Sequence, residues 1–247
     1  MSTKDLLKHA RSLQQKKFRD ERSAFLVEGQ KLVEELLRSG WKVQHLFATA
    51  ETADRMALPS PLIVAEHELQ RTGTLESGIG VLAVAEKPVQ EGTPSIGPEE
   101  LVLALDGVND PGNLGTVIRI ADWFGIRQVW CSEGSVDVYN PKTVRSSMGG
   151  IFRVAVRYCD LAHELGDQER AGTSIYMATM DGRPVFEETL GRKALLVLGS
   201  ESHGLSTDVL RVPHRSISVP RGGQAESLNV AMAASALCME FARQRTP

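Results

Sequence analysis

The sequence predicts an α/β protein with a mostly parallel sheet, preceded by a smaller α/β domain. After about residue 100, apolar strand segments alternate with helical segments, a pattern typical of a parallel sheet. Strands such as LVLALD (101–106) and ALLVLG (194–199) are apolar almost throughout, as expected when both faces are covered. A segment rich in proline and glycine, AEKPVQEGTPSIGPEE (85–100), separates the two parts. We therefore predict a small domain at 1–86, a linker at 87–99 and a larger domain at 100–247.

The small domain contains short strands and one clear amphipathic helix. AFLVEG (24–29) has the pattern of a buried strand, and residues 30–39 carry apolar side chains at helical spacing. VQHLFA (43–48), PLIVAE (61–66) and GVLAVAE (80–86) are predicted as further strands.

The larger domain continues as alternating strands and helices. We expect strands at 101–106, 128–132, 152–157, 174–180, 194–199 and 216–219, and helices near 113–124, 141–148, 160–170 and 227–243. In such sheets the ligand crevice lies beyond the carboxyl ends of the strands. The loops 106–115, 199–205 and 220–228 all begin at such ends.

Composition limits the class of protein. An apolar share of 42% and a charged share of 24% are those of a globular protein, and no apolar run is long enough to cross a membrane. The polar N-terminus lacks a secretory signal. Three separated cysteines without a CxxC pair fit reduced thiols better than disulfides or zinc. We expect a cytoplasmic protein that binds no membrane and no metal.

Two nucleotide-binding patterns are absent from the loop after 101–106. Gly107 and Gly112 have P-loop spacing, but Asn113 and Leu114 stand where a lysine and a hydroxyl are needed. The Rossmann pattern lacks its leading GxG. The glycine-containing loops could hold an adenosine through main-chain hydrogen bonds.

Together the three loops resemble the signature motifs of the SpoU (TrmH-type) branch of the SPOUT RNA methyltransferases. The first motif is matched by Asn109, Gly112, Asn113, Gly115, Arg119 and Ala121, the second by Gly199, Glu201 and Gly204, and the third by residues 219–233. The segment FRDERSAFLVEGQKLVEELL (18–37) also resembles the small substrate-binding domain often fused in front of this family.

The resemblance implies a deep trefoil knot in the C-terminal domain, a homodimer, and S-adenosylmethionine bound by the knotted loops. It assigns catalytic or positioning roles to Arg119, Asn113, Glu201, Ser227 and Asn229, and cofactor contacts to Leu198, Gly199, Val219 and Leu228. Because the cofactor carries its own reactive charge, no metal is expected.

Each of these residues also has an ordinary structural interpretation. A guanidinium is a poor base because it stays protonated, so we expect Arg119 to bind a phosphate and steady the developing alkoxide, although proton abstraction stays open. Otherwise Arg119 could reach from its helix to a surface carboxylate. Asn113 and Ser227 could simply cap helices. Glu201 is expected to orient Arg119 or the loop backbone; Glu201 beside His203 lacks the third ligand of a metal site.

RNA contacts are expected at two basic segments. Lys142 and Arg145, three residues apart, match a K-x-x-R-x-S-x-G segment that lies near RNA in the family. Lys16, Lys17 and Arg19 belong to a basic N-terminal segment. For both segments, an ordinary solvated helix face is the alternative.

We therefore expect S-adenosylmethionine-dependent methylation of a ribose 2′-hydroxyl in RNA. Ribosomal RNA, of the 23S type, is expected rather than transfer RNA, because the transfer-RNA members commonly lack the N-terminal domain. The alternatives are a non-catalytic RNA-binding or ribosome-assembly factor on the same fold, and a SPOUT methyltransferase that acts on a base.

Overall fold

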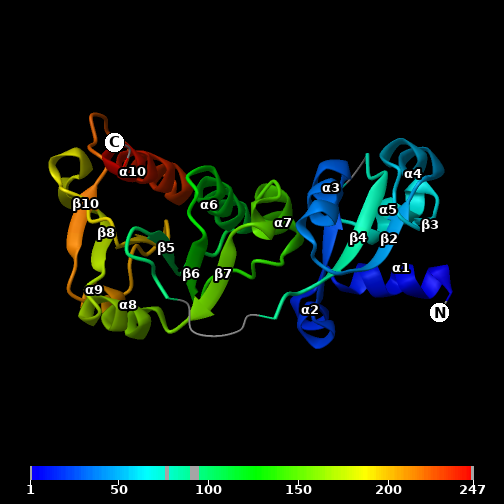
Figure 1. Ribbon diagram of the computed structural model, residues 1–247, viewed down its shortest axis with the longest axis horizontal. Helices are drawn as coiled ribbons and strands as arrows, with labels where there is room; N and C mark the ends of the chain where they lie inside the picture. The colour runs from blue at the N-terminus through cyan, green and yellow to red at the C-terminus, as the bar shows by residue number, and fades with distance from the viewer. Residues whose placement is uncertain (1, 76–77, 90–94, 246–247) are drawn as a thin grey trace. The chain divides into compact units, whose positions relative to one another are not determined.

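The computed structural model describes residues 2–75, 78–89 and 95–245, so that part of the predicted linker, residues 90–94, lies outside the described residues. The chain forms two compact units (Figure 1). Unit 1 contains residues 1–92 and 137–152, and unit 2 contains residues 93–136 and 153–247. Among the described residues, no helix is long and apolar enough to cross a membrane.

Unit 1 is a sheet with helices on both faces. In chain order it contains α1 (Thr3–Ser12), α2 (Lys16–Arg22), β1 (Ala24–Glu28), α3 (Gln30–Ser39), β2 (Val43–Ala48), α4 (Ala50–Met56), β3 (Leu62–Ile63), α5 (Glu66–Thr72), β4 (Val81–Glu86) and α7 (Pro141–Ser146). Within the described residues the strand order is β1-β4-β2-β3, with β4 antiparallel to both β1 and β2. One core joins the sheet to helices α1 and α5. It contains Leu26 and Phe47 from the sheet, Leu7 from α1, Leu13 at the C-terminal end of α1, and Leu69 from α5.

The segment 137–152 was predicted in the larger domain, and the structure places it in unit 1 instead. The reason is packing: the Tyr139 ring centroid lies 4.8 Å from that of Phe25, and the Phe152 centroid lies 5.3 Å from that of Trp41. Phe152 belongs to a 3-10 turn, Gly150–Phe152, so the strand expected at 152–157 begins later, as β7 (Ala155–Cys159).

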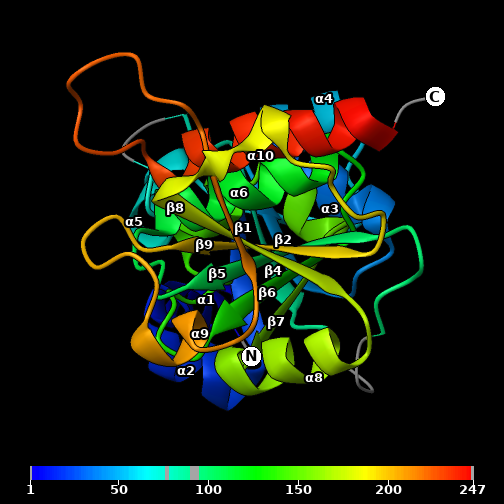
Figure 2. The same cartoon turned by 90° about the vertical axis from the view of Figure 1, so that its left-hand side faces the viewer.

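Unit 2 confirms the predicted α/β class with a parallel sheet. Its elements are β5 (Leu101–Asp106), α6 (Pro111–Trp123), β6 (Gln128–Ser132), β7, α8 (Leu161–Arg170), β8 (Ser174–Pro184), β9 (Ala194–Gly199), α9 (Thr207–Leu210), β10 (Arg215–Ser218) and α10 (Val230–Arg245). Within the described residues the strand order is β10-β8-β9-β5-β6-β7, and all these pairs are parallel. Helices α6 and α10 cover one face and α8 and α9 the other (Figures 1 and 2).

The strand order reverses between β5 and β9. The chain leaves β5 toward β6 on one side, whereas β9 pairs with β5 on the other, with Asp106 opposite Gly199 at their ends. In doubly wound sheets, such a reversal of order opens a binding crevice at the carboxyl ends. The loops after β9 and β10 project from the same side of this sheet (Figure 2).

Candidate functional site

The loops after β5 and β9 are joined by hydrogen bonds at this crevice. Asn113, in the first turn of α6, donates from Nδ2 to Glu201 Oε1 at 3.0 Å. Asn229 donates from Nδ2 to the same Glu201 oxygen at 2.5 Å and to Asn113 Oδ1 at 3.0 Å. These three residues, which we call the Asn–Glu–Asn network, come from the three sequence motifs. A carboxylate that accepts two amide donors fixes the orientation of both amides.

The alternative interpretation of Asn113 and Ser227 as helix caps is wrong, because other residues cap these helices. Asp110, not Asn113, caps α6, because its carboxylate accepts from Asn113 N at 2.9 Å. The last helix begins at Val230 rather than Ser227, and Asn229 Oδ1 accepts from Ala231 N at 2.9 Å. Asn229 therefore has two tasks, since its oxygen caps α10 while its nitrogen belongs to the Asn–Glu–Asn network.

Arg119 lies on the exposed side of α6. Among residues 2–75, 78–89 and 95–245, its guanidinium has no hydrogen-bond or ion-pair partner. Among the described residues, the structure thus provides no surface carboxylate for it. Glu201 was expected to orient either Arg119 or the loop backbone; it accepts from the two asparagines and, at 3.3 Å, from the backbone nitrogen of Val230, which fits the second alternative. The five donors of the guanidinium are available to a ligand.

An apolar cavity of about 660 Å³ lies beside the network, between the loops after β9 and β10. The four residues predicted to contact the cofactor, Leu198, Gly199, Val219 and Leu228, all line it. Glu201 and Ser227 also line the cavity, so the polar network meets the apolar wall at this point. Cavities of about 300–1,000 Å³ with apolar walls and a few polar groups are typical of small-molecule sites.

Gly199 permits a very close approach of two backbone segments. A Cβ atom at this position would lie 2.3 Å from the carbonyl carbon of Gly204 and 2.5 Å from the nitrogen of Leu205. Ser200 and Gly204 exchange backbone hydrogen bonds at 3.1 and 2.9 Å, which closes the turn that carries Glu201. Any side chain at residue 199 would therefore have to displace this turn.

The sequence analysis missed Asp106 and Ser132, which accept hydrogen bonds from the backbone of the loops after β9 and β5, respectively. Asp106, at the end of β5, accepts from Ser206 N at 2.7 Å and is 8% exposed. Ser132 Oγ accepts from Gly107 N at 2.8 Å. The sequence did contain a signal for Asp106, which is an acidic residue at the end of an apolar strand. It contained no comparable signal for Ser132.

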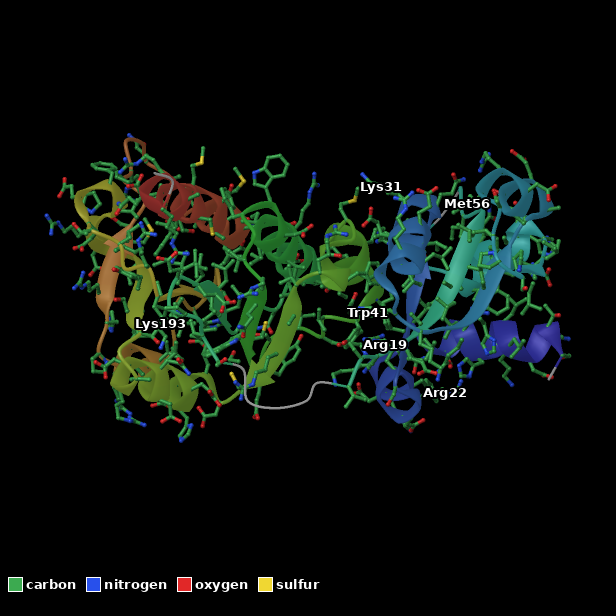
Figure 3. The ribbon with its side chains drawn as sticks, viewed as in Figure 1. Arg19, Arg22, Lys31, Trp41, Met56 and Lys193 are labelled. Carbon is green, nitrogen blue, oxygen red and sulfur yellow. The ribbon has the colours of Figure 1, made fainter. Side chains whose placement is uncertain are left out.

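The predicted RNA-contact residues lie in unit 1 and differ in exposure. Lys16, Lys17 and Lys142 are exposed, and Arg145 is half-buried. The prediction for Arg19 was wrong: Arg19, labelled in Figure 3, is 2% exposed, and its Nη2 lies 2.6 Å from Asp137 Oδ2. Its Nη1 donates to the carbonyl oxygens of Leu13 and Gln14 at 2.9 and 2.8 Å. Arg19 therefore links α2 to Asp137 and to the end of α1 within unit 1, and it cannot reach a nucleic acid.

Neither a metal cluster nor a reactive thiol stands out in the part of the chain that the structure describes. Within it, no group of three or more His, Cys, Asp or Glu side chains is arranged to hold a metal ion. Cys131, Cys159 and Cys238 are free and buried. Burial raises the pKa of Cys159 to about 11 and that of Cys238 to about 12.

Two family models match the chain. The model of the SpoU rRNA Methylase family matches residues 100–239, and the model of the MRM3-like substrate binding domain matches residues 4–102. A Bacillus subtilis (strain 168) protein named 23S rRNA (guanosine(2553)-2′-O)-methyltransferase RlmP is 35% identical over 238 residues, which cover 94% of this chain and 93% of that protein.

Solved structures agree with this match over the whole length. A Porphyromonas gingivalis structure, described as a candidate RNA methyltransferase of the TrmH family, has a TM-score of 0.88 and 37% identity and covers 99% of both chains. The SpoU methyltransferase AviRb from Streptomyces viridochromogenes, in complex with the cofactor AdoMet, has a TM-score of 0.86 and 27% identity over 99% of this chain and 98% of that one. Since the family model matches more than half of the chain and a relative at 35% identity spans nearly all of it, the chain belongs to the SpoU rRNA methylase family.

Proposed function

We propose that this protein uses S-adenosylmethionine to methylate a ribose 2′-hydroxyl in 23S ribosomal RNA. The observation that carries the proposal is the Asn–Glu–Asn network at the edge of an apolar cavity, because it unites all three family motifs in one site. The Bacillus subtilis relative, whose name specifies 2′-O methylation of a 23S guanosine, supports the choice of ribosomal RNA and of the ribose oxygen.

The cavity fits S-adenosylmethionine in size and chemistry. Its volume of about 660 Å³ suits a ligand of this size, and its apolar side chains suit an adenine ring. Leu198, Val219 and Leu228 would contact the cofactor, and the backbone at Gly199 could approach it closely because no side chain intervenes. When bound, S-adenosylmethionine supplies an activated methyl group on its sulfonium. The AviRb structure with AdoMet supports this assignment.

Arg119 is the residue that we assign to the RNA. Its guanidinium is exposed and has no partner within the described part of the chain, so it can form two parallel hydrogen bonds with a phosphate and hold the ribose in line. The same positive charge lowers the energy of the alkoxide that forms as the 2′-hydroxyl loses its proton. Because a guanidinium stays protonated in proteins, we favour these two roles over proton abstraction by Arg119.

The Asn–Glu–Asn network and Ser227 have positioning roles. Glu201 holds the amides of Asn113 and Asn229, and through them the first turns of α6 and α10, at fixed orientations. Ser227 lines the cavity and is an exposed residue, so its hydroxyl can donate to a bound ligand.

The trefoil knot, the homodimer and the cytoplasmic location stay predictions, and exposed apolar side chains support the homodimer. Trp123 on α6 and Met232 and Met239 on α10 are 83%, 64% and 63% exposed. Large exposed apolar side chains on two helices that pack together suit a two-fold interface.

In unit 1 we assign RNA contacts to Lys16, Lys17, Lys142 and Arg145. The match of this unit to the MRM3-like substrate binding domain supports the assignment. We group the segment 137–152, which carries Lys142 and Arg145, with unit 1, and otherwise keep the predicted division into two domains.

One experiment tests the proposed function. Purified protein is incubated with labelled S-adenosylmethionine and, separately, with 23S rRNA and transfer RNA transcribed in vitro, and the product is then treated with alkali. We expect label in 23S rRNA and resistance to cleavage at the modified nucleotide, because a methylated 2′-oxygen cannot attack the adjacent phosphate. Label in transfer RNA alone would reject the choice of substrate, and an alkali-sensitive product would indicate a methylated base. If wild-type protein bound the RNA without transferring label, the non-catalytic factor would be favoured.

A further inference from the structure

A short relay of hydrogen bonds in unit 1 ends at Arg145. Its Nη1 donates to Thr74 Oγ1 at 3.0 Å. Thr74 Oγ1 in turn donates to Glu28 Oε1 at 3.0 Å, and Thr74 N donates to Glu28 Oε2 at 2.8 Å. The relay thus joins the end of β1, the turn after α5 and the helix α7.

The chemistry of the hydroxyl gives the relay a direction. A threonine hydroxyl has one proton to donate and two lone pairs that accept. Because the Thr74 hydroxyl donates its hydrogen bond to Glu28, its oxygen can only accept from Arg145. Hydrogen bonding to a carboxylate also polarises the hydroxyl, which makes its oxygen a stronger acceptor.

Glu28 is an unusual residue to find at this position. It is 5% exposed, and among the described residues it forms no ion pair. A buried carboxylate is costly unless its oxygens accept hydrogen bonds, and here Thr74 supplies them to both oxygens. The turn also fits tightly: a Cβ atom on Gly73 would lie 2.8 Å from Glu28 Oε2. Gln14 braces the same turn by donating to the carbonyl oxygens of Thr72 and Gly73, both at 2.8 Å.

The Arg145 guanidinium is fixed by one hydrogen bond, and its other donors point to no carboxylate among the described residues. The bond to Thr74 uses one of its five donors, and within residues 2–75, 78–89 and 95–245 no carboxylate pairs with it. A half-buried guanidinium with a fixed orientation and several unused donors is suited to bidentate recognition of a phosphate.

We infer that Thr74 and Glu28 are positioning residues that hold the Arg145 guanidinium in the orientation in which it binds an RNA phosphate. This inference rests on the proposed function, which assigns an RNA contact to Arg145, and adds two residues that themselves touch no RNA. Without the hydroxyl of Thr74, Arg145 keeps its charge and loses its fixed direction, so RNA binding weakens while methyl transfer in the bound complex does not.

The test compares Thr74→Val, which removes the hydroxyl at nearly constant shape, with Thr74→Ser, which keeps it. We expect Thr74→Val to raise the KM for 23S rRNA about 3- to 10-fold, the range for one lost hydrogen bond, with kcat and the cofactor Kd unchanged. Thr74→Ser should restore the wild-type KM. Thr72→Val is the matched control, because its hydroxyl donates only to the Glu68 carbonyl oxygen, at 2.7 Å, within the same helix. Thermal unfolding shows whether each variant is folded.

A double-mutant cycle separates positioning from a structural effect. In an Arg145→Ala background, Thr74→Val should change the KM for RNA no further, because the group that it orients is gone. Independent, multiplicative effects of the two substitutions, or an unchanged KM in Thr74→Val, would overturn the inference.

Binding without catalysis gives a second readout. The Kd for protein-free 23S rRNA, measured by filter binding at several salt concentrations, should rise in Thr74→Val and in Arg145→Ala but not in Thr72→Val. Arg145→Ala should also reduce the salt dependence by about one phosphate contact. If the wild type methylated no RNA, the proposed function would fail, and this binding experiment would still decide the inference: an unchanged Kd in Thr74→Val would contradict it.

Discussion

Replacing Arg119 by alanine should separate activity from stability. The side chain is exposed on α6 and has no partner among the described residues, so its removal breaks no hydrogen bond or ion pair of the protein. Alanine is also the best helix former. We therefore expect the free energy of unfolding to stay within about 0.5 kcal/mol of the wild type, as for an ordinary surface substitution.

The effect on methyl transfer should be much larger. Removal of one group that stabilises a developing oxyanion lowers kcat by about 10²–10³-fold, or roughly 2.7–4 kcal/mol. Arg119→Lys keeps the charge but loses the planar pair of donors, so we expect it to recover only part of the rate.

The assay is single-turnover transfer of labelled methyl groups to 23S rRNA, with urea denaturation of the same preparations. Arg170→Ala is the matched control, because Arg170 is also an exposed arginine on a helix of unit 2, and α8, which carries it, covers the opposite face of the sheet from α6 (Figure 2). Full methylation by Arg119→Ala would refute the catalytic role of Arg119. Unfolding of the variant would refute the conclusion that the side chain has no structural partner.

Three further predictions follow from the site and the core. Asn229→Ala should lower both kcat and the free energy of unfolding, the latter by about 1–2 kcal/mol because α10 loses its cap. Asn229→Ser should keep a side-chain cap and lose activity, because it has no amide to donate to Glu201; equal stability of the two variants in urea would contradict this. Gly199→Ala should destabilise unit 2 by about 1–3 kcal/mol, because the new methyl group would overlap the backbone at Gly204. It should also weaken S-adenosylmethionine binding, measured by isothermal titration calorimetry. A cofactor Kd equal to that of the wild type would count against the cavity as the cofactor site. Burial raises the pKa of Cys159 to about 11 and of Cys238 to about 12, so iodoacetamide at about pH 8 should label these thiols only after denaturation. The folded-state pKa values of both thiols exceed the ordinary value of about 8.5. The free energy of unfolding should therefore be independent of these thiols below about pH 8.5. It should fall as the pH rises from there toward 11 and 12, because the unfolded thiols lose protons that the folded ones keep.

The sequence by itself determined the elements whose signal is local. The apolar segments 101–106, 128–132 and 194–199 form strands with the predicted bounds, and residues 30–39 form the predicted helix. In these elements the periodicity of apolar side chains and the packing agree, so the pattern alone was sufficient. The resemblance to the family motifs also pointed to the three residues that form the Asn–Glu–Asn network.

Tertiary structure decided what depends on partners far away in the chain. Asn113 and Glu201 are 88 residues apart, and they meet because β5 and β9 are neighbours in the sheet, which no local pattern reveals. Arg19 was predicted to contact RNA as part of a basic segment, but its guanidinium is buried and pairs with Asp137, 118 residues later in the chain. For the same reason the segment 137–152 joined unit 1: its aromatic side chains pack on Phe25 and Trp41, and burial of apolar surface outweighs proximity in sequence.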